Sequence, residues 1–325
     1  MQVVSVPFDH LELPLPGRHD GKVRSSWTLA DDPALGPRRL FVTTDRLSAF
    51  DRVVGYVPGK GQLLNQLSWW WFGQLADIIT HHGLSVPDPA ALVARTASPL
   101  PVEVIVRRAI TGVTDTSLWR RYEGGARTID GHSLPNGLTK NELLPRPIIT
   151  PTTKGPTGSH DEPLSVADVA RQGLVEHTLW DQICEVAIEM FQLGEGIAER
   201  AGLVLADTKY EFGIGHDGDL LLIDEVHTPD SSRFWERSTF ASRISAGQEP
   251  ENLDKEIVRR AFADLGYRGN GPIPDLAPAV WSAAADGYRT TYERLTGDRF
   301  VIADHHPTQR IPAALRAAGL LPEST

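Results

Sequence analysis

Strict alternation of charged and uncharged residues at positions 207–212 (DTKYEF) is the feature that most restricts the fold. Successive side chains of a β-strand point to opposite faces of a sheet, so this order predicts a strand with its three charged residues on one face. Apolar runs at 203–205 and 220–223 flank the segment, and the Asp-Gly pair at 217–218 favours a tight turn. The sequence therefore predicts a buried antiparallel hairpin over 203–226.

Two carboxylates are expected to face each other in this hairpin. A two-residue turn at 217–218 places Glu211 directly opposite Asp224, where like charges repel unless something compensates. A divalent cation is one compensation, and oxygen ligands without His or Cys suit Mg²⁺. Lys209 then lies one step away as a point charge for a phosphate. The alternative is a solvated face on which Lys209 screens the acids, but the apolar flanks favour a buried pair of strands.

Composition and charge restrict the class of protein. The chain has 325 residues, enough for roughly two domains. Its 32 Lys+Arg against 42 Asp+Glu give a net charge of −10, which argues against nucleic acid or an anionic membrane surface as the main partner. The single cysteine, Cys184, excludes an intrachain disulfide and a cysteine-rich metal site. We expect a cytoplasmic protein, because neither a signal peptide nor an apolar run of about 20 residues is present.

Periodicity outlines the elements along the chain. Residues 1–60 predict short antiparallel strands, and 99–108 predict a further strand. Residues 112–163 are rich in Gly, Pro, Thr and Asn, which is typical of a functional loop region. Apolar residues at helical spacing, some after capping residues, predict helices. The expected helical ranges are 62–79, 165–201, 253–265, 277–296 and 307–318.

Several short polar segments could hold a phosphate. In 21–24 (GKVR), a Lys and an Arg at i, i+2 share one strand face, which would suit a strand over a nucleotide's phosphates. The segment 45–51 (DRLSAFD) ends a strand with polar residues. Taken alone, each segment is more often a surface turn than a phosphate site. Gly59-Lys60-Gly61 resembles the end of a Walker A loop, but no Ser or Thr follows the lysine. The G-x-G-x-x-G spacing at 213–218 precedes a strand instead of a helix, which argues against a dinucleotide site.

Two more polar segments are candidates for ligand contact. Lys154 and the His160-Asp161 pair lie at the end of the irregular region, where neighbouring Gly and Pro allow a mobile flap or an exposed loop. Asp230 and Arg233 lie three apart on a Pro-containing turn. They could bind a hydroxyl and a phosphate, or they could pair with each other.

Taken in order, the motifs resemble those of the phosphoribosylaminoimidazole-succinocarboxamide synthase (SAICAR synthetase) family. The resemblance covers about residues 20–300. The matching segments are GKVR (21–24), TTDRLSAFD (43–51), PGKGQLLNQLS (58–68), PVEVIVR (101–107), TG (111–112), LPNGL (134–138), TPTTK (150–154), HDE (160–162), LADTKYEFG (205–213), DEVHTPDSSRFW (224–235) and DKEIVRRAF (254–262).

The resemblance implies an α+β fold related to kinase and ATP-grasp folds. An antiparallel β lobe that binds ATP, residues 1–107, would clamp the nucleotide against a larger α/β lobe with terminal helices, residues 108–325. The implied reaction joins the carboxylate of carboxyaminoimidazole ribonucleotide (CAIR) to the amine of L-aspartate, with ATP becoming ADP and phosphate. A carboxylate activated as an acyl phosphate needs Mg²⁺ and lysine near the transferring group.

The resemblance also implies roles for individual residues. Lys22 and Arg24 would lie near the ATP phosphates, and Glu211 and Asp224 would bind Mg²⁺. Lys209 would lie beside the reacting carboxylate. The residues implied at the substrates are Ser48, Arg107, Lys154, Asp161, Asp207, Asp230 and Arg233.

The sequence departs from the family pattern in three places. Ser25 replaces an Asp, Trp27 replaces a Tyr, and Arg108-Ala109 replace a Gly-Tyr pair after Arg107. The last change adds a charge near the expected substrate pocket. It leaves open a paralogue that runs the same ligation on a related heterocyclic carboxylate in specialised nucleoside metabolism. A kinase-like or non-catalytic nucleotide-binding protein is a further alternative, although every acid and base that the metal and phosphates require is present. The sequence leaves open a homo-oligomer.

Overall fold

The computed structural model describes residues 6–114, 116–155 and 162–322. Its first sheet is antiparallel, with strands in the order β1-β2-β3-β7-β6. The strand bounds are His19–Asp20 (β1), Arg24–Asp32 (β2), Gly36–Thr43 (β3), Gly83–Asp88 (β6) and Ala91–Arg95 (β7). A separate hairpin, β4 (Arg46–Ala49) and β5 (Arg52–Tyr56), follows β3. Strands β1 to β5 match the short antiparallel strands expected in the first 60 residues, whereas β6 and β7 were not expected.

The second sheet holds the charged strand. Its order is β11-β8-β13-β14, with β12 also paired to β8 and β15 to β13. The bounds are Ala97–Ala109 (β8), Leu143–Ile149 (β11), Thr152–Thr153 (β12), Leu203–Gly215 (β13), Leu220–Ile223 (β14) and Ser232–Glu236 (β15). All of β8 lies in the second sheet, and the division of the chain into two lobes stays a prediction. A boundary after Arg107 stays a prediction.

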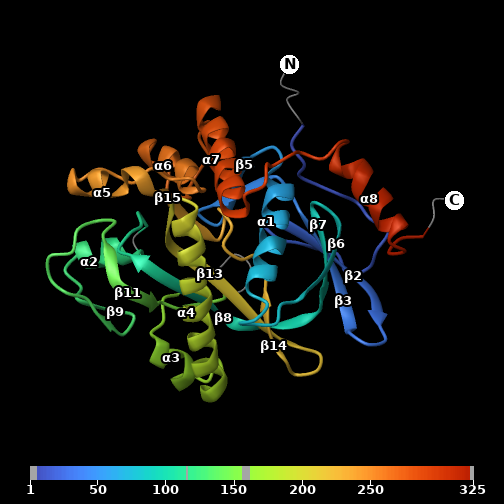
Figure 1. The fold of residues 1–325 in the computed structure, drawn as a ribbon, viewed down its shortest axis with the longest axis horizontal. Coiled ribbons are helices and arrows are strands. Elements are labelled where there is room, and N and C mark those ends of the chain that lie inside the picture. The colour runs from blue at the N-terminus through green and yellow to red at the C-terminus, as the bar shows by residue number, and fades with distance from the viewer. Residues whose placement is uncertain (1–5, 115, 156–161, 323–325) are drawn as a thin grey trace.

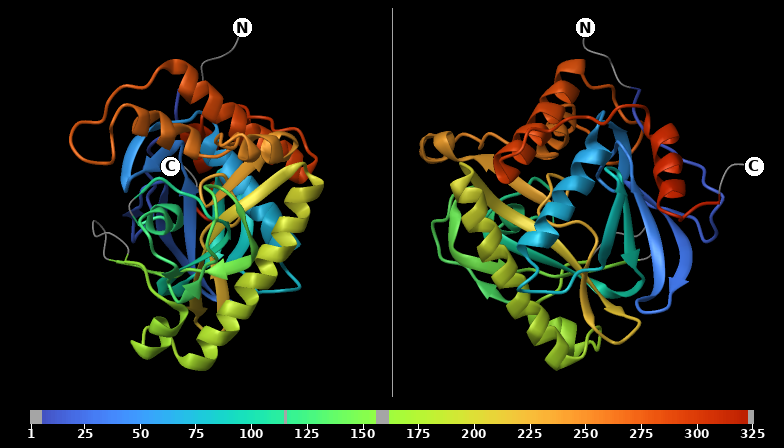
Figure 2. Two further views of the ribbon diagram at one scale, coloured as in Figure 1. Left: turned by 90° about the vertical axis from the view of Figure 1, so that its left-hand side faces the viewer. Right: turned by 45° about the vertical axis from the view of Figure 1, so that its right-hand side comes forward.

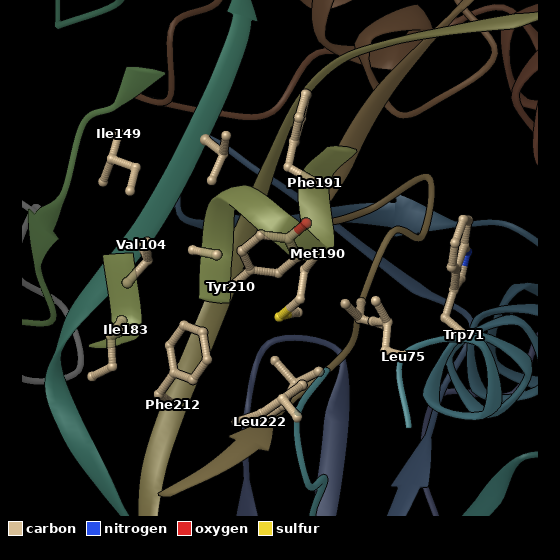
Figure 3. Close-up of a cluster of buried hydrophobic side chains, with 14 of the residues drawn as sticks. Trp71, Leu75, Val104, Ile149, Ile183, Met190, Phe191, Tyr210, Phe212 and Leu222 are labelled. Carbon is tan, nitrogen blue, oxygen red and sulfur yellow. The ribbon is translucent and has the colours of Figure 1, made fainter. Parts of the chain in front are cut away.

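The two faces of β13 differ as the alternation predicts. Tyr210 and Phe212 are fully buried in the largest apolar core, together with Ile183 and Met190 of helix α4 (His177–Arg200). Figure 3 shows these side chains gathered between β13 and α4. The polar residues of β13 therefore lie on the opposite face, away from α4.

The hairpin register differs by one residue from the expected one. Glu211 pairs with Ile223, not with Asp224. The loop has three residues instead of two, because Gly215 N–H donates to Asp219 O at 2.8 Å and Gly218 adopts the left-handed φ of 89°. A three-residue hairpin loop requires such a residue, and glycine adopts it without strain.

Helices fill the remaining layers (Figures 1 and 2). Their bounds are Lys60–Gln74 (α1), Leu118–Glu123 (α2), Val166–Arg171 (α3), Arg237–Ser245 (α5), Glu256–Asp264 (α6), Pro278–Thr296 (α7) and Pro307–Ala317 (α8). The region expected as one helix from 165 to 201 is two, α3 and α4, because the chain turns at Gly173 with φ 68°. The expected cap is confirmed: Ser165 and Asp168 form a capping box.

The C-terminal helix returns to the first sheet. Ile311 and Leu315 of α8 are fully buried in one cluster with Phe8, Trp27 and Leu40. Figure 1 shows α8 beside β2 and β3. The mixture of helices and antiparallel sheets agrees with the predicted α+β class. Among the described residues, no helix is long and apolar enough to span a membrane.

Gly194 of α4 gives a first testable prediction. A Cβ at this position would lie 2.2 Å from Cε1 of His227, whose fully buried ring also meets Trp71 at a centroid distance of 4.5 Å. Gly194→Ala should therefore lower the free energy of unfolding by about 2 kcal/mol. Chemical denaturation measures this. Gly196→Ala is the control, because its Cβ would meet nothing closer than Arg200 Nη1 at 3.6 Å. Equal stability of the two variants would contradict the prediction.

Candidate active site

Neighbouring strands bring the charged residues together on the polar face of the second sheet. Asp207 of β13 lies opposite Arg107 of β8 and opposite Arg233 of β15. Lys209 lies two residues after Asp207 on β13, and Glu211 lies two residues after Lys209. All three side chains are therefore on the same face of the sheet. The site is thus assembled by strand pairing between segments about a hundred residues apart in the sequence.

Lys209 is the centre of a cluster of carboxylates. Its Nζ contacts Glu211 and lies 3.1 Å from Glu103 Oε1 and 3.5 Å from Asp224 Oδ2. Glu103 of β8 lies directly opposite Glu211 in the ladder. Two carboxylates therefore face each other as expected, but the residue opposite Glu211 is Glu103 and not Asp224. Asp224 follows β14 with φ 66°, and its carboxylate still reaches Lys209.

Two further cations reach these carboxylates from other elements. Arg24, the first residue of β2, places Nη1 2.8 Å from Asp224 Oδ1 and Nη2 3.5 Å from Glu225 Oε2. Lys154, just after β12, contacts Glu211. Because β2 belongs to the first sheet and β12 to the second, both sheets contribute to one charge cluster.

The cluster fixes the charge of its members. Burial opposes ionisation of Asp224, but Arg24 and Lys209 outweigh it and hold the pKa of the carboxyl well below its usual range. Burial would likewise lower the pKa of Lys209, yet Glu211 and Asp224 raise it well above 10.5. Glu225 differs, because burial raises its pKa in spite of Arg24. Asp224 and Lys209 are therefore charged at neutral pH.

A second group of charges lies next to the first. Arg107 Nη1 is 3.0 Å from Asp207 Oδ2, its Nε donates to Thr150 Oγ1 at 2.7 Å, and Arg233 contacts the same oxygen of Asp207. Burial alone would lower the pKa of Arg233, but Asp207 and Glu256 outweigh this effect and raise that pKa above its usual value. Two partly buried guanidinium groups that share one carboxylate can also hold a phosphate.

A small cavity opens beside Arg233. Its lining includes Thr111, Gly112, Lys140 and Glu256. Arg233 Nε is buried and makes no hydrogen bond among the described residues, and Glu256 Oε2 lies 3.6 Å from it. An anionic group that entered from this side would find an unsatisfied donor.

The other expected site residues lie elsewhere. Asp230 pairs with Lys60 and Tyr288. Lys22 Nζ lies 2.5 Å from Asp51 Oδ1, outside the Lys209 cluster. Ser48 is on β4, paired with Val53 of β5. Asp161, with its neighbour His160, lies outside the described residues.

Comparisons with known proteins now decide the family. The family model described as SAICAR synthetase matches residues 18–273. The phosphoribosylaminoimidazole-succinocarboxamide synthase of Legionella pneumophila (strain Lens) is 42% identical over 300 residues, 91% of this chain and 93% of that protein. The chain belongs to the SAICAR synthetase family.

Two further members agree with this assignment. The chloroplastic phosphoribosylaminoimidazole-succinocarboxamide synthase of Arabidopsis thaliana is 42% identical over 296 residues, 91% of this chain and 69% of that protein. The solved SAICAR synthase of Saccharomyces cerevisiae, complexed with SAICAR, is 30% identical and has a TM-score of 0.75. That match covers 92% of this chain and 100% of the yeast chain. The α+β fold expected from the SAICAR synthetase resemblance is confirmed.

The structure also places the residues that depart from the SAICAR synthetase pattern. Arg108 follows Arg107 on β8 and points to the opposite face, where its Nε donates to Glu195 Oε1 of α4 at 2.9 Å. Ala109 is buried against Ala206 and Trp235. Trp27 and Ser25 are both buried on strand β2 of the first sheet. The added charge of Arg108 therefore lies away from the charged cluster, so it gives no support to a changed substrate.

Several residues of the site were not expected from their local sequence. Glu103, an acid between two valines and four residues before Arg107 on the same strand, could have been found by that position. The segment of Lys60 does not fit the Walker A pattern, so the sequence gives this lysine no role. Glu225 directly follows the expected metal ligand Asp224. Tyr288 carries no local signal, since its role depends on the packing of α7.

Proposed function

We propose that this chain is an ATP-dependent ligase of purine biosynthesis that joins the carboxylate of CAIR to the amine of L-aspartate. The products are SAICAR, ADP and phosphate. The observation that carries the proposal is the cluster around Lys209, in a chain of the SAICAR synthetase family, where cations of both sheets meet the carboxylates Glu211 and Asp224.

The chemistry explains why cations gather here. An oxygen of the CAIR carboxylate attacks the γ-phosphorus of ATP, and ADP leaves. The aspartate amine then attacks the acyl phosphate carbon, loses a proton, and phosphate leaves. Lys209 stabilises the negative charge that develops at the reacting carboxylate, and Arg24 holds the ATP phosphates. Neither residue forms a covalent bond, so positioning and electrostatics supply the rate.

The residues also fit Mg²⁺. Within the described ranges no group of three or more His, Cys, Asp or Glu side chains is arranged to hold a metal ion. Mg²⁺ is commonly held by one or two carboxylates with water and substrate phosphates, which Glu211 and Asp224 would supply. When bound, the ion neutralises charge on the transferring phosphoryl group. Lys154 and Lys209, which contact Glu211 here, would be released toward the phosphates.

CAIR is assigned to the second group of charges. Arg107 and Arg233 are suited to its phosphate, and Asp207 holds the two guanidinium groups side by side. The roles of Lys22 at ATP and of the remaining residues at the substrates stay predictions. Those remaining residues are Ser48, Lys154, Asp161 and Asp230. A cytoplasmic location and a homo-oligomer also stay predictions.

An assay of ADP release tests the proposal. With ATP, Mg²⁺, CAIR and L-aspartate present, ADP release should be rapid, and omission of CAIR should abolish it. Omission of aspartate should reduce it to the hydrolysis of the acyl phosphate. Well-folded protein with no CAIR-dependent release would refute the proposal and leave a paralogue with another carboxylate. Arg108, the residue that suggested such a paralogue, lies on the other face of β8, so we retain CAIR.

A further inference from the structure

The carboxylate of Asp230 is enclosed by the protein. Its side chain is 3% exposed. Oδ2 lies 2.7 Å from Lys60 Nζ, and Oδ1 accepts a hydrogen bond from the Tyr288 hydroxyl. Both oxygens are therefore engaged within the chain itself.

Lys60 is unusual because its side chain is completely buried. It is the first residue of α1, and its Nζ also donates to Arg46 O at 2.9 Å. Burial of a lysine is strongly unfavourable unless the charge is paired, and an apolar residue of similar volume would fill the same space without that penalty. Packing alone therefore gives no reason for a charge at this position.

Three distant parts of the chain meet at this carboxylate. Lys60 begins α1, Asp230 lies in the loop before β15, and Tyr288 lies in α7, which packs against α1. Tyr288 is also 1% exposed. A change at Lys60 or Tyr288 would therefore act on the loop, although neither residue belongs to it.

Hydrogen bonds within the loop at 227–231 couple the position of Asp230 to neighbouring strands. Asp230 N–H and Ser231 N–H both donate to Thr228 Oγ1 at 3.2 Å. Ser231 O accepts the backbone N–H of Lys209 at 2.9 Å. Two residues further, Arg233 contacts Asp207. The loop thus connects Asp230 to both charge groups of the active site.

We propose that Lys60 and Tyr288 are positioning residues that clamp Asp230, and through its loop set Arg233 and Lys209 in the geometry that CAIR requires. The inference rests on the proposed function. In this inference Asp230 acts through the loop, and its predicted direct contact with a substrate is a separate question.

The test uses Tyr288→Phe, which removes only the phenolic hydroxyl. We expect the KM for CAIR to rise about ten-fold, the loss of roughly one hydrogen bond to a charged group, while the KM for ATP stays within about two-fold. Hydrogen exchange of the 227–234 amides should be faster. Thr291→Val, one turn further along α7, is the matched control, because it removes a buried hydrogen bond to Leu253 O without touching Asp230.

The outcomes separate a positioning role from a structural one. If Tyr288→Phe and Thr291→Val lose similar stability and neither changes the KM for CAIR, the clamp is only structural and the inference is wrong. Lys60→Met should give a larger rise in the same KM where it folds. Wild-type protein without CAIR-dependent ADP release refutes the proposed function and this inference with it. Normal wild-type kinetics with an unchanged Tyr288→Phe enzyme refutes the clamp alone.

Discussion

Asp224→Asn is expected to lower the rate of CAIR-dependent ADP release by about 100- to 1,000-fold while the fold stays intact. The carboxylate is held ionised by Arg24 and Lys209, and it supplies one of two proposed oxygen ligands for Mg²⁺. Asparagine has the same shape but no charge, so metal and phosphate binding should both weaken. Steady-state rates over a range of Mg²⁺ concentrations measure the loss.

The fold should survive because of the backbone at this position. Asp224 has φ 66°, a left-handed conformation that asparagine adopts as readily as aspartate. Asp217→Asn is a matched control, since it removes a carboxylate from the turn of the same hairpin, where Arg95 Nη2 lies 2.8 Å away. Its activity should equal that of the wild type. Full activity of Asp224→Asn at low Mg²⁺ would exclude Asp224 as a ligand.

The sequence predicted the two faces of β13 because the alternation of side chains depends only on local backbone geometry. Asp207, Lys209 and Glu211 share the polar face, and Tyr210 and Phe212 share the core, as expected. The register was one residue wrong, because the left-handed Gly218 lengthens the loop. The Asp217-Gly218 pair is compatible with both a two-residue and a three-residue loop, so this dipeptide alone does not determine the turn type.

Contacts between distant elements could not be predicted from the residues alone. Glu103 faces Glu211 only because β8 pairs with β13, and Lys60 meets Asp230 only because α1 packs beside the loop before β15. Family resemblance indicated Arg24 and Lys154 at the site, and the structure brings both to the expected carboxylates. Tertiary pairing, not local propensity, assembles the site.

Lys209→Met should show the second large effect, on turnover and on stability together. We expect ADP release to fall about 1,000-fold, because the cation beside the reacting carboxylate is lost. The free energy of unfolding should fall by about 2 kcal/mol, a value below that of a fully buried pair because Lys209 is 28% exposed. The reason is that Glu103 and Glu211, which face each other in the ladder, lose the charge between them.

Added Mg²⁺ separates this explanation from a simple packing defect. If the carboxylates that lose Lys209 in the Lys209→Met variant bind the ion, millimolar Mg²⁺ should raise the Tm of the variant more than that of the wild type. Arg95→Met is the control, since it removes a cation from Asp217 and Asp219 at the far end of the same hairpin. Its turnover should stay near the wild-type value. If Lys209→Met kept turnover within ten-fold of the wild type, Lys209 would not lie beside the reacting group. If Mg²⁺ raised the Tm of Lys209→Met and of the wild type equally, the facing carboxylates would not be the source of the instability.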